Sequence, residues 1–175
     1  MTLRGAAPYL AVLALVGLGY LAQRSLTPST PDAGPLVRLD ALWSAHLPDL
    51  EGRPQALEQW RGKVLVLNFW APWCPPCRRE IPGFIALQKQ YAAQGVQFVG
   101  VALDDPERVR EFAQEHGINY PILLGGDAAM RLAQDAGSAG GLPYSVVFNR
   151  RGESVNAITG EIVGKRLETL LKPLL

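Results

Sequence analysis

The sequence predicts an α/β domain in which a mixed β-sheet is flanked by helices. Residues 64–69 form a run that is apolar except for Asn68, as expected of a central strand that is covered on both faces. The elements that follow alternate as strand, helix and strand, and the chain then continues with a hairpin and a final helix. We expect this domain to span residues 36–175, about 140 residues, which is enough for one hydrophobic core.

The first predicted helix follows the central strand directly. Pro75 and Pro76 suit the first turn of a helix, where backbone N–H groups have no partners within the helix. The helix should bend at Pro82, which removes a hydrogen bond, and should end at Gly95. A second strand is expected over residues 96–103.

Later elements have equally clear limits. Asp105 caps a helix that Gly117 closes, with an apolar stripe made by Val109, Phe112, Ala113 and His116. A short strand (120–124), a short helix (127–135), and two strands (144–148 and 153–158) joined by a turn at 149–152 complete the sheet. The last helix presents a stripe of Val163, Leu167, Leu170, Leu171 and Leu174. Residues 36–63 are an N-terminal extension, with a hairpin around Glu51-Gly52 and a helical turn near 57–60.

The first 24 residues differ in composition from the rest. Residues 6–22 carry no charge, with Arg4 before them and Arg24 after them. Their length is at the low edge of the ~17–25 residues of a transmembrane helix. We expect an uncleaved single-pass anchor over residues 1–24. A cleaved signal peptide is the alternative, although Tyr20 and Gln23 intrude where the cleavage site would lie.

Export of the domain follows from either interpretation. Arg4 and the amino terminus favour a cytoplasmic N-terminus, so the domain is expected on the outer or periplasmic side of a bacterial inner membrane. Residues 25–35 contain Pro28, Pro31 and Pro35 among small polar residues, which indicates an extended linker. The net charge of +1 comes from 17 basic and 16 acidic residues that are well mixed, so nucleic acid is not an expected partner.

The only two cysteines of the chain, Cys74 and Cys77, are separated by two prolines at the junction of strand and helix. The positive end of a helix dipole and nearby N–H groups favour a thiolate at the first cysteine of such a pair. We therefore predict that Cys74 is an exposed nucleophile. Cys77, one turn deeper, should be buried and should resolve the mixed disulfide.

Three other interpretations of the cysteine pair have less support from the sequence. A structural zinc site needs two more ligands, and only His46 and His116 are available as histidines, far apart in sequence. Covalent haem attachment needs a histidine after the second cysteine, where this chain has Arg78. A purely structural disulfide over so short a loop removes little chain entropy. Redox chemistry is the best interpretation.

Residues 67–82, with the sequence LNFWAPWCPPCRREIP, resemble the TlpA/ResA branch of the thioredoxin-fold thiol–disulfide oxidoreductases. A second match is Gly141-Leu142-Pro143. The resemblance implies a thioredoxin-like fold and an outward-facing, membrane-tethered reductase of protein disulfides. Apocytochrome c and copper-site cysteines are the substrates that it suggests. The chain shows no NADPH or flavin fingerprint, so we expect no cofactor and a membrane electron donor for re-reduction.

Glu80 lies three residues after Cys77, on the same side of the predicted helix. The resemblance implies that this carboxylate tunes the ionisation of the cysteines and accepts the proton of Cys77. A surface charge paired with an arginine is the alternative. Thioredoxin has an aspartate at the position of Asn68, and an asparagine cannot accept a proton, which strengthens the case for Glu80.

The resemblance also identifies a substrate-binding loop. Pro143 matches a cis-proline that faces the cysteines, and the Leu142 backbone would be presented to an extended substrate; an ordinary trans proline is the alternative. Trp73 is a candidate for an apolar docking surface, with packing as the other possibility, whereas Trp70 is expected in the core.

The direction of the redox reaction follows from the donors near Cys74. Pro75 and Pro76 have no N–H, so the thiolate depends on the N–H groups of Cys77 and Arg78 and on the helix dipole. A poorly stabilised thiolate favours reducing power. The predicted function is a thiol–disulfide reductase; a general exported oxidase and a non-catalytic binding module are the alternatives.

Overall fold

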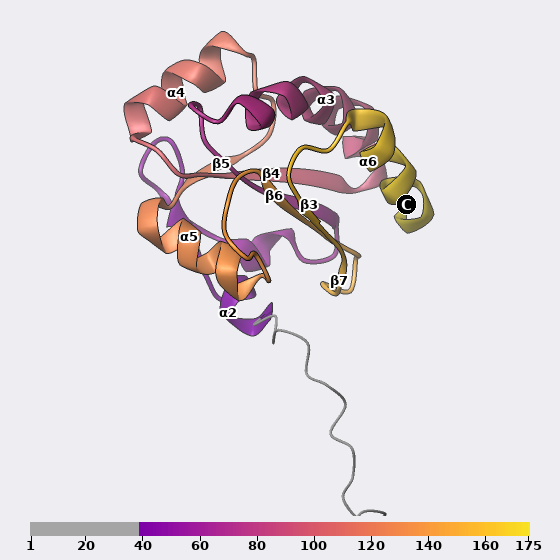
Figure 1. The fold of residues 1–175 in the computed structure, drawn as a ribbon. Coiled ribbons are helices and arrows are strands. Elements are labelled where there is room, and N and C mark those ends of the chain that lie inside the picture. Colours follow the sequence, from indigo (N-terminus) through magenta and orange to yellow (C-terminus); the bar gives the residue numbers. More distant parts are fainter. Residues whose placement is uncertain (1–38) are drawn as a thin grey trace, which may run out of the picture. The chain divides into compact units, whose positions relative to one another are not determined.

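The computed structural model describes residues 39–175, whose main sheet has five strands in the order β5-β4-β3-β6-β7 (Figure 1). The central strand β3 (Val64–Trp70) runs parallel to β4 (Val96–Ala102) and antiparallel to β6 (Tyr144–Phe148). The edge strands are β5 (Ile122–Leu124), parallel to β4, and β7 (Ser154–Thr159), antiparallel to β6. The sheet is mixed, and the predicted fold class is confirmed.

Helices cover both faces of the sheet. Figure 1 shows α3 (Pro75–Tyr91), α4 (Pro106–Glu115) and α6 (Gly164–Leu171) on one face. The other face is covered by α2 (Leu39–Trp43) and α5 (Gly126–Asp135). Because the sheet is buried on both sides, its central strand is apolar at every position except Asn68 and does not alternate between apolar and polar residues.

Successive residues of β3 enter different parts of the core. Leu65, Leu67 and Phe69 pack with the side chains of α5, and Val64 and Val66 pack with those of α3 and α6. Because side chains alternate along a strand, Asn68 belongs to the α3 side of the sheet. It is the one polar residue in a strand whose residues are all buried.

The helix after the cysteines has the predicted limits. Its first residues are Pro75 and Pro76, it contains Pro82, and a 3₁₀ turn (η2, Ala92–Gln94) leads to Gly95. Gly95 has a φ of 82°, a left-handed conformation that glycine adopts without strain. At α4 the carboxylate of Asp105 accepts the backbone N–H of Glu107 at 2.9 Å, so the predicted cap is confirmed as well.

One residue of the predicted apolar stripe on the last helix, Val163, is exposed and not buried. Val163 is 66% exposed, whereas Ile162 before it is fully buried. Val163 is the N-cap of α6 and has an extended backbone, so the 3.6-residue period does not yet apply to it. Leu167 and Leu171 are buried as expected, and the helix ends in a 3₁₀ turn (η3, Lys172–Leu174).

The N-terminal extension forms the predicted hairpin. Strands β1 (His46–Pro48) and β2 (Pro54–Ala56) pair antiparallel, and a 3₁₀ turn (η1, Leu57–Trp60) follows. Asp49 makes an isolated bridge to Leu123 of β5, which joins the hairpin to an edge of the main sheet.

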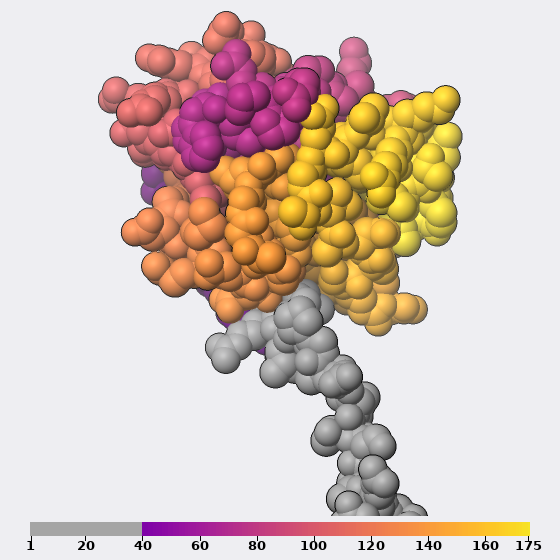
Figure 2. Space-filling model, viewed as in Figure 1, coloured from indigo at the N-terminus to yellow at the C-terminus, as the bar shows by residue number. Residues whose placement is uncertain are grey.

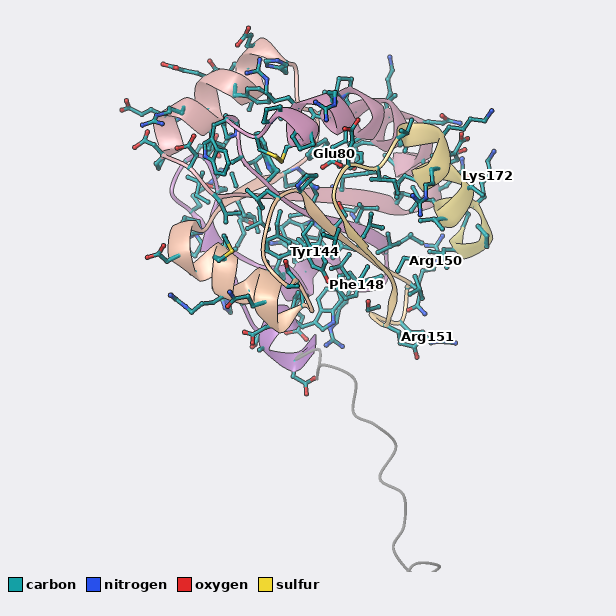
Figure 3. All side chains as sticks on the ribbon, viewed as in Figure 1. Glu80, Tyr144, Phe148, Arg150, Arg151 and Lys172 are labelled. Atoms are coloured by element: carbon teal, nitrogen blue, oxygen red, sulfur yellow. A yellow bond between two sulfur atoms is a disulfide. The ribbon has the colours of Figure 1, made fainter. Side chains whose placement is uncertain are left out.

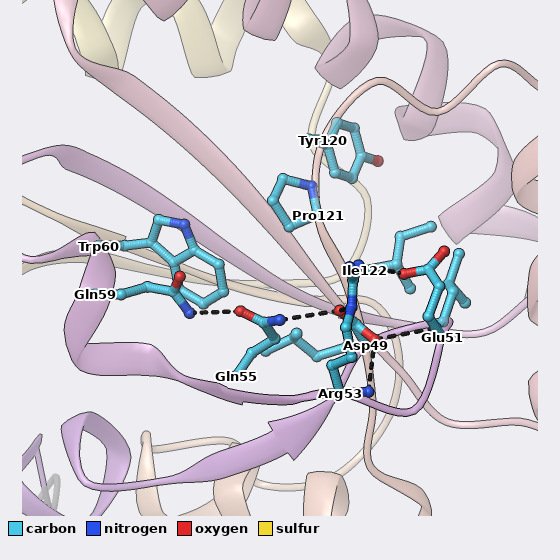
Figure 4. A pocket seen from close by; sticks show the side chains of 11 residues that line it. Asp49, Glu51, Arg53, Gln55, Gln59, Trp60, Tyr120, Pro121 and Ile122 are labelled. Atoms are coloured by element: carbon cyan, nitrogen blue, oxygen red, sulfur yellow. Dashed lines mark hydrogen bonds and ion pairs between the residues drawn. The ribbon is translucent and has the colours of Figure 1, made fainter.

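The carboxylate of Asp49 organises the turn of this hairpin (Figure 4). It accepts the backbone N–H groups of Glu51 at 3.0 Å and Arg53 at 2.9 Å, the Arg53 guanidinium at 2.9 Å and the Gln55 amide at 2.9 Å. These residues line a cavity of about 360 Å³ together with Trp60 and part of β5; its lining includes neither cysteine.

The predicted anchor (1–24) and linker (25–35) lie outside the described residues. Within residues 39–175, no helix is long and apolar enough to cross a membrane.

Candidate active site

Cys74 and Cys77 form a disulfide at the start of α3 (Figure 3). Cys74 is the N-cap residue of the helix, and Pro75 and Pro76 occupy its first positions. The backbone N–H of Cys77 points at Cys74 Sγ, 3.3 Å away. The sequence places the first cysteine there because β3 ends at Trp70 and proline is tolerated in the first helical turn.

The expectation that Cys74 is exposed was wrong for this oxidised form. Cys74 is 3% exposed and Cys77 is fully buried. Both side chains belong to an apolar cluster with Ile81 of α3 and Phe112 of α4, and Leu142 packs against the same cluster. The disulfide ties Cys74 to its buried partner, so Cys74 keeps only a narrow opening. It is nevertheless the less buried of the two cysteines.

One expected donor to the Cys74 sulfur is absent. The N–H of Arg78 donates to the backbone oxygen of Cys74 at 3.1 Å, in an ordinary helical bond, and not to Sγ. The Arg78 guanidinium stacks over the Phe112 ring, 5.4 Å from its centroid. Within residues 39–175, the N–H of Cys77 is the one hydrogen-bond donor to Cys74 Sγ.

Glu80 points into the protein from the second turn of α3 and is 2% exposed (Figure 3). Asn68 Nδ2 donates to Oε1 at 2.8 Å, and the backbone N–H of Ile162 donates to Oε2 at 3.1 Å. The alternative of a surface charge paired with an arginine is wrong for this residue. Arg79 makes that pair instead, with Glu161 at 2.6 Å.

Burial raises the pKa of Glu80 to about 7. The hydrogen bonds from Ile162 and Asn68 act in the opposite direction because they stabilise the carboxylate, and the negative charge of Glu161 adds to the increase. A carboxyl group with this pKa exists in both protonation states near neutral pH. It can therefore take up and release a proton there.

From the sequence, Asn68 stood out only because thioredoxin has an aspartate at its position. In the structure its amide also donates to Ser145 Oγ at 2.9 Å, and Asn68 and Ser145 are register partners on β3 and β6. Neither Ser145 nor Ile162 was identified as part of the site. The available signal was one polar residue in each of two strands that are otherwise apolar.

The Leu142–Pro143 peptide bond is cis, as expected, and the alternative of a trans proline is wrong. Gly140 and Gly141 precede it with φ values of 102° and 98°, a conformation that favours glycine. The Pro143 oxygen accepts the N–H of Gly160 at 2.8 Å, which holds the loop against the end of β7.

A groove of about 530 Å³ runs beside this loop. Its wall includes Trp73, which is 62% exposed and therefore not packed in the core, whereas Trp70 is fully buried as predicted. The other residues that line the groove are Leu103, Asp104, Gly126, Asp127, Met130, Gly141 and Leu142. Figure 2 shows the surface of α3 bordered by the α5–β6 segment and by the segment that leads into α6.

The structure thus places all six predicted site residues at one end of the sheet or at the start of α3. These residues are Trp73, Cys74, Cys77, Glu80, Leu142 and Pro143. Their individual roles stay predictions. The arrangement is suited to thiol–disulfide exchange, because a cysteine pair at a helix N-terminus lies on the same helix as a buried proton-exchanging group and near an open groove.

Comparisons with known proteins agree with this chemistry. The family model described as AhpC/TSA family matches residues 40–155. ResA, a thiol–disulfide oxidoreductase of Halalkalibacterium halodurans, is 36% identical over 131 residues, which cover 73% of each chain.

Two solved structures have the same fold. A thiol:disulfide interchange protein of Chlorobium tepidum has a TM-score of 0.67 and 30% identity, over 75% of this chain and 92% of its own. A secreted Mycobacterium tuberculosis disulfide oxidoreductase, homologous to DsbE of E. coli, has a TM-score of 0.66 and 26% identity, over 77% and 99%. With its cysteine pair at the helix start, the chain belongs to the AhpC/TSA family and is a thiol–disulfide oxidoreductase of the ResA/DsbE type.

Proposed function

We propose that the chain is an exported, membrane-tethered reductase of protein disulfides, with its domain on the outer or periplasmic side of a bacterial inner membrane. The uncharged segment at residues 6–22 supports the tether. A similar solved protein that is described as secreted supports export. Electrons reach the disulfide from a membrane donor, since the chain has no fingerprint for NADPH or flavin.

The observation that carries the reductase assignment is that Cys74 Sγ has a single N–H donor among residues 39–175. A strong oxidant of this kind needs a well-stabilised thiolate, because that thiolate makes its reduced form stable. Pro75 and Pro76 supply no donors, and the Arg78 N–H is used by the helix. The dithiol form is therefore only weakly favoured and gives up its electrons readily.

In the first step, the Cys74 thiolate of the reduced enzyme attacks a substrate disulfide. A bond forms between Cys74 Sγ and one substrate sulfur, and the second substrate sulfur leaves as a thiolate that is protonated by water. The N–H of Cys77 stabilises the attacking thiolate. Cys74 is assigned this role because it is the less buried cysteine.

In the second step, Cys77 attacks Cys74 Sγ. The Cys77 thiol first loses its proton to Glu80, whose pKa of about 7 suits this transfer. The Cys74–Cys77 disulfide forms, the bond between Cys74 Sγ and the first substrate sulfur breaks, and that sulfur leaves as a thiolate that is protonated by water. The substrate has then gained two electrons from the enzyme and two protons from water, and Glu80 holds the proton of Cys77, which it releases to water.

The substrate binds in the groove beside the cis-proline loop. Trp73 and Leu142 offer apolar contact, and the backbone next to Pro143 can pair with an extended polypeptide. The resemblance to the TlpA/ResA branch makes the cysteines of apocytochrome c the proposed substrate, in the course of cytochrome c maturation.

The reduction potential of the Cys74–Cys77 couple distinguishes a reductase from an oxidase. We expect a value near that of thioredoxin, about −270 mV, when the protein is equilibrated with glutathione or dithiothreitol buffers. A value near −120 mV, as in a strong oxidant, would exclude the reductase and favour a general exported oxidase.

Trapping identifies the partner and separates an enzyme from a non-catalytic binding module. Cys77→Ser removes the resolving thiol, so a mixed disulfide with the substrate should accumulate on Cys74. Cys74→Ser is the matched control and should trap nothing. In the reduced wild-type protein, Cys74 should also be alkylated much faster than Cys77; slow, equal labelling and an empty trap would support the binding module.

A further inference from the structure

The buried hydrogen bonds around Glu80 use only one half of the Asn68 amide. Both bonds leave from Nδ2, to Glu80 Oε1 at 2.8 Å and to Ser145 Oγ at 2.9 Å. Asn68 Oδ1 is buried and has no hydrogen-bond partner within residues 39–175. A buried acceptor without a partner is costly, so its presence beside a titratable group needs an explanation.

The two oxygens of Glu80 have different partners. Oε2 accepts the backbone N–H of Ile162, which always donates. A neutral acid keeps this bond best when Oε2 is its carbonyl oxygen, so the proton belongs on Oε1. Oε1 is the oxygen that faces Asn68 Nδ2. A protonated Oε1 and an N–H of Asn68 would then be two donors pointing at each other.

Rotation of the amide by a half-turn about its Cβ–Cγ bond resolves this conflict. Oδ1 then takes the place of Nδ2 and accepts the Oε1 proton of Glu80. Ser145 adapts to either orientation, because its hydroxyl accepts from Nδ2 in one and donates to Oδ1 in the other. Each orientation leaves one half of the amide without a partner, so the cost is similar in both protonation states.

We propose that Asn68 is a positioning residue that serves both protonation states of Glu80, donating from Nδ2 to the carboxylate and accepting on Oδ1 from the acid. The inference rests on the proposed role of Glu80 as proton acceptor. It explains why an amide, which never ionises, is compatible with proton transfer at this position. A second carboxylate there would compete with Glu80 for one proton.

Other ionisable groups near Glu80 are few. Cys77 lies on the same helix and does not titrate while it is in the disulfide. Glu161, in the segment before α6, is paired with Arg79. Tyr120, before β5, has a pKa that burial and the charge of Glu80 raise above its usual value. The oxidised protein therefore isolates the titration of Glu80.

The first test is a pH titration of the oxidised full-length chain, followed by NMR of the Asn68 side-chain amide. We expect both amide protons to shift with a midpoint near pH 7. The shift should vanish in Glu80→Gln, where no proton is exchanged. An amide signal that does not change between pH 5 and 9 in the wild-type protein would overturn the inference.

The second test uses Asn68→Leu, which has nearly the same shape but no hydrogen-bonding groups. The carboxylate loses a charge-assisted hydrogen bond, whereas the acid loses only a weaker neutral one, so the pH of half-maximal turnover should rise by about one unit. Ser145→Ala should produce a smaller rise, because the amide loses only its second contact. Asn119→Leu removes an amide that bonds Ile85 at the surface, and should leave the midpoint unchanged.

The outcomes separate this inference from the proposed function. If Glu80→Gln keeps full turnover while the Asn68 amide titrates in the wild-type protein and not in Glu80→Gln, Glu80 is not the catalytic base, but the coupling of Asn68 to Glu80 stands. If turnover depends on Glu80 while Asn68→Leu leaves the pH midpoint in place, Asn68 is not its positioning residue.

Discussion

Asp49 and Glu80 are both nearly buried carboxylates, at 8% and 2% exposure, yet their pKa values move in opposite directions. Burial acts to raise the pKa of Asp49, but hydrogen bonds from Arg53, Gln55 and the Glu51 backbone outweigh it and hold the pKa below its usual value. Glu80 has one amide and one backbone N–H as donors, and burial raises its pKa to about 7.

The difference shows that the donors, and not burial alone, decide what a buried carboxylate can do. Asp49 has four hydrogen bonds, one of them from a cation, and stays ionised to hold the hairpin turn in place. Glu80 has two neutral donors, which hydrogen-bond its carboxylate but do not outweigh the effect of burial on its pKa. The first arrangement is suited to structure and the second to proton transfer.

The largest expected effect is the loss of turnover in Glu80→Gln. This change is nearly isosteric, so the fold should be kept, and it removes the base that activates Cys77. Turnover on a protein disulfide should fall by about 10²–10⁴-fold. The cysteine pKa values should also fall, because a nearby negative charge disfavours a second anion. Unchanged turnover together with unchanged cysteine pKa values would leave Glu80 without a role in catalysis.

The pH dependence of stability should differ between the two carboxylates. The pKa of Glu80 in the folded protein, about 7, lies above the ordinary value of 4.5 for a glutamate, so the folded state holds an extra proton between these values. The unfolding free energy of the oxidised protein should therefore fall by about 3 kcal/mol from pH 4.5 to 7, relative to Glu80→Gln. Urea unfolding across this range measures it, and parallel curves for the two proteins would contradict it.

Asp49 should contribute with the opposite sign. Its lowered pKa stabilises the fold above the unfolded pKa, and this contribution is lost as the pH falls through the folded pKa. Asp49→Asn should lower stability at neutral pH, flatten the acid limb of the stability curve and leave turnover unchanged. A loss of turnover at full stability would mean that the hairpin takes part in catalysis.

The smallest effect is expected for Gln55→Leu. This change removes one of four donors to Asp49 and leaves the ion pair with Arg53 intact. The unfolding free energy should fall by less than in Asp49→Asn, and turnover should not change. Chemical denaturation of the three proteins at one pH checks the order. An effect as large as that of Asp49→Asn would show that the amide, rather than the arginine, holds the carboxylate.

Most of the fold could be predicted because its signals are local. The apolar residues of β3, the prolines at the start of α3 and the cap at Asp105 act over a few residues, and each predicted element lies within a few residues of its expected limits, whereas the short helix α2 was not predicted. Val163 was misplaced because a cap residue is not yet subject to the helical period. The exposure of Cys74 was misjudged because it depends on Phe112 and Leu142, which are distant in sequence.

The sequence by itself determined the chemistry: two cysteines at a strand–helix junction, prolines that withhold donors, and a glutamate one turn further along the helix. Tertiary structure alone decided how those groups are tuned. Glu80 receives its hydrogen bonds from Asn68 and Ile162, on a strand before it and a loop 82 residues after it. Helical spacing predicts which side of a helix a carboxylate occupies. Its pKa depends on the donors and the burial that the rest of the chain brings to that side.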